Sequence, residues 1–93
     1  MDIQEKLKNI ERRVFSVKDN KICFGKKSGV YVSDENGKSV RITGLSGTRK
    51  ETGGIPMVFA DFTRDNGSED GYLLSCLLDS ELDNIYNELF NRN

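Results

Sequence analysis

The sequence predicts an α+β fold, in which an antiparallel β-meander of four to five strands is flanked by an N-terminal and a C-terminal amphipathic helix. Three observations lead to this prediction. Both ends of the chain have apolar residues at helical spacing, the middle contains short alternating or continuous apolar runs, and glycine-containing turns separate those runs. With 93 residues the chain is expected to form one domain, residues 1–93.

The first helix is expected at residues 2–15. One apolar stripe with spacings of four, three and four runs along it: Ile3, Leu7, Ile10 and Val14. Asp2 is suited to cap the helix, and Glu5 stands three residues later, as in a capping box.

A short strand is expected at residues 21–25, and a β-hairpin follows it. A two-residue loop in this hairpin would place Val32 opposite Arg41. A three-residue loop, Glu35 to Gly37 with Gly37 left-handed, instead pairs apolar with apolar residues and Asp34 with Lys38. The second register is therefore predicted. It pairs Val32 with Val40, Val30 with Ile42 and Tyr31 with Arg41, with the four aliphatic residues facing the core.

The glycine-rich stretch GLSGTRKETGGIP, residues 44–56, is interpreted as a loop that connects two strands. It lacks the Walker motif of a P-loop, because no glycine is followed by Lys-Ser or Lys-Thr and a strand comes next. The alternative is a ligand or partner loop, in which backbone amides hold an anion beside Thr48, Arg49 and Lys50.

Two further strands are expected at residues 56–62 and 71–78, with a helix as the alternative for residues 72–78 because they alternate poorly. Asp79 or Ser80 is expected to cap the last helix. Its apolar face consists of Leu82, Ile85, Tyr86 and Leu89. Both strands have apolar residues on both faces. Two short helices can cover one face of a sheet but hardly both faces. A second copy of the chain, giving a homodimer, is therefore expected on the other face. The alternative is one helix on each face, which would keep the chain monomeric.

The sequence offers little for catalysis. It contains no histidine, and neither Cys23 nor Cys76 belongs to a CxxC motif, so no enzymatic activity, metal site or cofactor is predicted. Both cysteines lie among apolar residues and are expected to be buried. A group of acidic residues does not follow the EF-hand spacing and is interpreted as a solvated turn. Its members are Asp61, Asp65, Glu69 and Asp70.

The charge is divided unevenly along the chain. Residues 1–50 contain twelve basic and six acidic residues, a balance of +6, whereas residues 51–93 contain two basic and nine acidic residues, a balance of −7. This uneven charge has two interpretations. The two halves of the chain attract each other, or the folded protein has a basic face beside an acidic one. No run approaches the ~20 apolar residues of a membrane span. A cytoplasmic protein without membrane contact is expected.

These observations favour binding over chemistry. The leading hypothesis is a non-enzymatic protein–protein interaction module, such as an inhibitor or accessory factor of bacterial or phage origin; eight asparagines and eight lysines suggest an AT-rich genome. The alternative is a binder of nucleic acid or of a nucleotide phosphate that uses the basic hairpin and residues 44–54. The candidate binding residues are Lys26, Lys27, Tyr31, Arg41, Thr48, Arg49 and Lys50.

Overall fold

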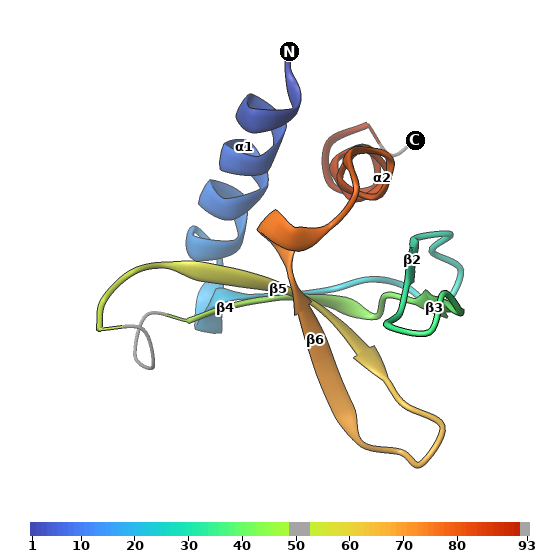
Figure 1. Cartoon of the computed structure of the whole chain (residues 1–93). Helices are drawn as coiled ribbons and strands as arrows, with labels where there is room; N and C mark the ends of the chain where they lie inside the picture. Colours follow the sequence, from blue (N-terminus) through green and yellow to red (C-terminus); the bar gives the residue numbers. More distant parts are fainter. Residues whose placement is uncertain (49–52, 92–93) are drawn as a thin grey trace.

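The computed structural model describes residues 1–48 and 53–91. Its longer elements are the helices α1 (Ile3–Phe15) and α2 (Asp79–Phe90) and the strands β1 (Lys21–Cys23), β2 (Tyr31–Ser33), β3 (Ser39–Arg41), β4 (Gly44–Thr48), β5 (Met57–Thr63) and β6 (Glu69–Leu73). Two short 3₁₀ helices, η1 (Lys18–Asn20) and η2 (Leu74–Cys76), precede β1 and follow β6. The predicted α+β class is confirmed (Figure 1).

The strands form two antiparallel sheets in the described part of the chain. The larger has four strands in the order β1-β4-β5-β6, and the smaller is the β2–β3 hairpin, which is inserted between β1 and β4 in the sequence. The chain therefore does not run as one five-stranded meander, because the hairpin lies apart from the main sheet (Figure 1).

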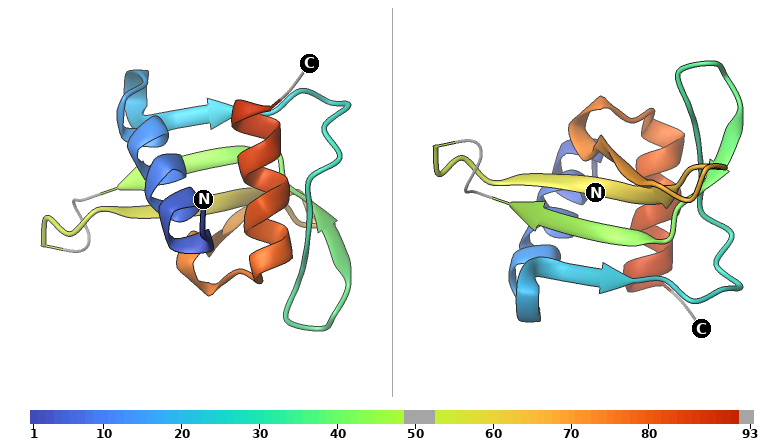
Figure 2. Two further views of the ribbon diagram at one scale, coloured as in Figure 1. Left: turned by 90° about the horizontal axis from the view of Figure 1, so that it is seen from above. Right: turned by 90° about the horizontal axis from the view of Figure 1, so that it is seen from below.

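Both helices lie side by side on one face of the four-stranded sheet (Figure 2). Asp2 caps α1 as predicted, since its carboxylate accepts from the Glu5 amide at 2.9 Å. Lys6 of α1 forms an ion pair of 2.6 Å with Asp83 of α2 and lies over the Tyr86 ring. The Lys6–Asp83 contact joins the basic half of the chain to the acidic half.

The hydrophobic core lies between the helices and the sheet and extends under the small hairpin. It contains the apolar faces that were expected for α1, α2 and the hairpin, together with one face of β5. Its buried residues are Ile10, Val14, Val30, Val32, Ile42, Leu45, Val58, Ala60, Phe62, Leu74, Leu82 and Ile85.

The predicted hairpin register is confirmed. Val32 pairs with Val40 and Tyr31 with Arg41 across β2 and β3. Gly37 has a φ of 78°, the left-handed conformation that the three-residue loop requires. The Ser33 amide also donates to the carboxylate of Glu81 at 2.8 Å, which ties this hairpin to the first turn of α2.

The interpretation of the glycine-rich stretch as a loop is wrong for its first part. Gly44–Thr48 is β4, one of the two inner strands of the sheet, which pairs with β1 on one side and β5 on the other. Leu45 is fully buried, and a Cβ atom on Gly47 would lie 2.8 Å from the ring of Phe15. Gly47 therefore allows α1 to pack closely on the sheet, a use that glycine has in strands as well as in loops.

Two further expectations also need correction. The strand predicted at residues 71–78 begins earlier, at Glu69, and ends at Leu73, where the 3₁₀ helix η2 follows. The N-cap of α2 is Leu78 rather than Asp79 or Ser80. Its amide is satisfied by the carboxylate of Glu81, three residues on, at 2.9 Å.

Candidate binding site

The face of the four-stranded sheet opposite the helices is called the open face here (Figure 2, right). Strand alternation assigns its residues, because Leu45, Val58 and Ala60 point into the core and their neighbours point away from it. Register places two rows of side chains across all four strands. One row is Cys23, Gly44, Asp61 and Gly71, and the next is Lys21, Ser46, Phe59 and Leu73.

A groove of about 460 Å³ lies on the open face. The β5–β6 hairpin bends away from the helices (Figure 1), which makes this side of the sheet concave. Gly44 and Asp61 contribute to the lining of the groove, and Lys21, Cys23 and Glu69 also border it. Polar groups from all four strands therefore converge on one depression.

Asp61 is the half-buried acidic residue of this groove. Its Oδ1 accepts a hydrogen bond from the Ser46 hydroxyl at 3.1 Å, and its backbone carbonyl accepts from the Thr43 amide at 2.8 Å. Burial raises the pKa of the Asp61 carboxyl, and repulsion from Glu69 adds to this effect, whereas the Ser46 hydrogen bond and the charge of Lys21 lower it. The ionised carboxylate is thus incompletely compensated by its own protein.

An apolar strip adjoins the groove on the same face. Met57 and Phe59 alternate with core residues along β5, and Leu73 of β6 is the direct partner of Phe59. These three side chains are half-buried, and within residues 1–48 and 53–91 no helix covers this side of the sheet (Figure 2). The open face therefore combines a polar groove with a small apolar surface.

Both cysteines are exposed, so the expectation that they are buried is wrong. Cys23 alternates with Ile22, whose side chain packs on the core, and its thiol therefore lies on the open face beside the groove. Cys76 belongs to η2, where the chain has left the sheet. Apolar neighbours in the sequence did not imply burial, because strand alternation and the 3₁₀ turn direct these side chains outward.

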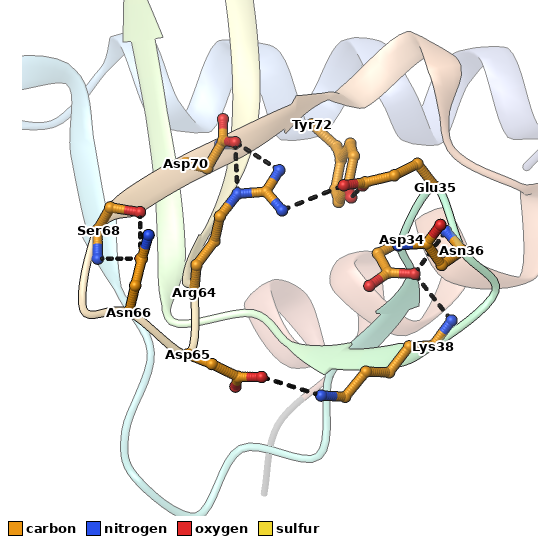
Figure 3. A network of polar contacts seen from close by, with 11 residues as sticks. Asp34, Glu35, Asn36, Lys38, Arg64, Asp65, Asn66, Ser68, Asp70 and Tyr72 are labelled. Carbon is orange, nitrogen blue, oxygen red and sulfur yellow. Dashed lines mark hydrogen bonds and ion pairs between the residues drawn. The ribbon is translucent and has the colours of Figure 1, made fainter.

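A polar network between the two hairpins includes Asp70, one of the residues that line the groove (Figure 3). Arg64, just after β5, contacts Asp70 of β6 at 2.6 Å and Glu35 of the small hairpin at 3.1 Å. The Tyr72 hydroxyl also donates a hydrogen bond to the carboxylate of Glu35. The hydrogen bond from Tyr72 is the main cause that lowers the pKa of Glu35, and the one from Arg64 is the main cause for Asp70. The network links the tips of two hairpins that are distant in the sequence.

The acidic residues predicted to form a solvated turn do not act as one cluster. Asp65 pairs with Lys38 at 3.2 Å, and Asp70 pairs with Arg64, whereas Asp61 and Glu69 border the groove. Within residues 1–48 and 53–91, no group of three or more histidine, cysteine or acidic side chains is arranged to hold a metal ion.

The candidate residues from the sequence separate into two regions. Tyr31 and Arg41 are directly paired, and the Arg41 guanidinium reaches the Gly25 carbonyl at 3.5 Å, next to the exposed Lys26 and Lys27. Thr48 ends β4, away from the small hairpin (Figure 1). Arg49 and Lys50 lie outside the described residues.

Sequence reasoning missed the groove. Asp61 was considered only as part of an acidic turn, and Gly44 and Ser46 only as parts of a loop. The signal that could have identified it is the pairing of Asp61 with a glycine on each neighbouring strand, Gly44 and Gly71, which becomes visible only when the registers are known.

Comparison of this chain with models of known protein families, with curated proteins and with solved structures finds no match. In the part of the chain that the structure describes, neither helix combines the length and apolar character that crossing a bilayer requires.

Proposed function

We propose that this chain is a small, non-catalytic protein-interaction module whose partner binds the open face of the four-stranded sheet. The observation that carries this proposal is the position of both helices on one side of the sheet. The half-buried Met57, Phe59 and Leu73 are left uncovered beside a polar groove on the other side. A fully desolvated apolar centre with a polar surround is the usual composition of a protein interface.

Composition and the exposed thiols support a more specific class of protein. The chain has no histidine for acid–base work and is small enough to act as an inhibitor or accessory factor of bacterial or phage origin. Two exposed free thiols, Cys23 and Cys76, are compatible with the reducing cytoplasm, where such thiols persist. We therefore assign the module to that compartment.

Replacing Phe59 with alanine is expected to weaken partner binding about tenfold or more, because a buried aromatic anchor contributes more than about 1.4 kcal/mol to a protein interface. The matched control is Tyr31→Ala, which removes an aromatic ring that is 48% exposed on the small hairpin. Immobilised wild-type and variant chains are incubated with lysate of the source organism, and retained proteins are identified by mass spectrometry. The affinity of a retained protein for each variant is then measured by calorimetry.

A partner that is lost with Phe59→Ala and kept with Tyr31→Ala supports the open face. The reverse pattern would move the interface to the small hairpin. The homodimer expected from the sequence is the case in which the partner is a second copy. Sedimentation equilibrium decides this point, since a mass of 10.5 kDa throughout would exclude the dimer.

Nucleic-acid binding is the second candidate function, and one observation favours it. Tyr31 is exposed beside Arg41, and the contact of Arg41 with Gly25 brings it next to Lys26 and Lys27. An aromatic side chain among basic ones is suited to stack on a base while the cations contact phosphates.

If this second function is correct, a fluorescent single-stranded oligonucleotide binds at low salt, and its affinity falls steeply as salt is raised. Arg41→Glu is expected to remove most of the binding, whereas Lys18→Glu, outside this group, is expected to have a small effect. Fluorescence anisotropy measures both. Absence of any binding at low salt would eliminate this function.

A further inference from the structure

The row of residues around Asp61 has an unusual composition. Its neighbours across the sheet on the open face are Gly44 on one side and Gly71 on the other. A Cβ atom on Gly71 would lie 2.9 Å from Oδ1 of Asp61, so a larger residue there would collide with the carboxylate. Two glycines therefore leave the Asp61 carboxylate uncovered at the floor of the groove.

The carboxylate has unused hydrogen-bonding capacity. Ser46 donates to Oδ1 at 3.1 Å. Among the described residues, no donor is bonded to Oδ2. Oδ2 is not fully buried, so it is open to the groove, where the charged donor of a ligand can bond it.

The charges around the groove are also unbalanced. Asp70 is neutralised by Arg64, through the ion pair of 2.6 Å. The remaining charged residues at the groove are Asp61, Glu69 and Lys21, which leaves one net negative charge. The groove is thus complementary to a single positive charge.

We propose that this groove receives the ammonium or guanidinium group of a lysine or arginine side chain from the protein partner. This inference rests on the proposed function, because it names the chemistry of the partner at the same face. Oδ2 of Asp61 accepts a hydrogen bond from the cationic group. Gly44 and Gly71 allow the basic side chain to lie close to the sheet. A metal ion fits less well, since no three ligating side chains are grouped within the described residues.

The apolar strip adds a spacing to this recognition. Asp61 and Phe59 lie two residues apart on β5, about 7 Å along the strand. An extended partner segment has the same repeat, so a residue two positions from its basic residue reaches Phe59. The partner is therefore expected to present a basic residue and an apolar residue separated by one position.

A pair of peptides tests the inference. One is acetyl-Gly-Arg-Ser-Leu-Gly-amide, and the other has citrulline, the neutral analogue of arginine, in place of arginine. Each is titrated to high millimolar concentration into the ¹⁵N-labelled chain and followed by NMR. The arginine peptide is expected to shift the amides of Gly44, Ser46 and Gly71, with an affinity at least about tenfold higher than that of the citrulline peptide.

Two variants control the result. Asp61→Asn keeps the shape of the side chain and an oxygen for the Ser46 hydrogen bond, so the fold is retained while the preference for arginine is expected to disappear. Asp65→Asn removes an acidic group whose side chain is 95% exposed at the hairpin tip, outside the groove, and is expected to bind as the wild type does. The spectra of both variants report directly whether they are folded.

Shifts that are absent, equal for the two peptides, or unchanged in Asp61→Asn overturn the inference. Its failure differs from failure of the proposed function. A partner whose capture depends on Phe59 but not on Asp61 leaves the interaction module intact and removes the cation pocket. If capture of the partner depends on neither Phe59 nor Asp61, the result contradicts both the cation pocket and the proposed binding at the open face.

Discussion

Replacing Phe62 with alanine is expected to destabilise the fold by about 3–5 kcal/mol, the usual cost of removing a buried aromatic ring from a core. Phe62 is 2% exposed, and its ring stacks on Tyr72 with centroids 4.9 Å apart. A chain of this length has a free energy of unfolding of about 5–14 kcal/mol. The variant therefore loses a large share of its stability. Urea denaturation followed by circular dichroism measures the loss, and the melting temperature should fall by at least about 12 °C.

Phe59→Ala is the matched control for this prediction. Phe59 lies on the same strand, but its side chain points to the open face and is half-buried. Its replacement is expected to cost clearly less stability than that of Phe62, while it weakens partner binding. Equal losses of stability in the two variants would contradict the division of β5 into a core face and a binding face.

Replacing Gly44 with alanine is expected to displace β1 from the sheet and to destabilise the fold by about 1–3 kcal/mol. A Cβ atom at this position would lie 2.3 Å from the carbonyl oxygen of Ile22 and 3.3 Å from the Cα atom of Cys23. Both are main-chain atoms, so no side-chain rotation can relieve the contact. The Phe24 amide, which donates to Thr43 at 2.9 Å, is expected to exchange its hydrogen faster in the variant.

Gly29→Ala provides the comparison, because no heavy atom lies within 4 Å of the position that its Cβ would occupy. This variant is expected to stay within about 0.5 kcal/mol of the wild type. If Gly44→Ala is as stable as Gly29→Ala, the close approach of β1 to β4 is not as described here. Hydrogen exchange measured by NMR reports on both variants.

The candidate site could be predicted only in part. The pairing of Tyr31 with Arg41 followed from the loop length and from matching side chains across one hairpin. The groove did not follow, because Asp61 gains its surroundings from Gly44 and Gly71, which precede and follow it by many residues. Ser46 was hidden for the same reason, since a segment rich in glycine has a low strand propensity when judged alone.

The sequence by itself determined the features that depend on neighbouring residues: the apolar stripe and cap of α1, the apolar face of α2, and the register of the β2–β3 hairpin with Gly37 left-handed. Periodicity and turn chemistry act over a few residues, so they can be read directly. The tertiary structure alone decided that Gly44–Thr48 is an inner strand and that the hairpin leaves the main sheet. It also decided that both helices cover the same face. These outcomes depend on which distant segments bury Leu45 and Phe62 together, and pairing energies between distant strands leave no local pattern in the chain.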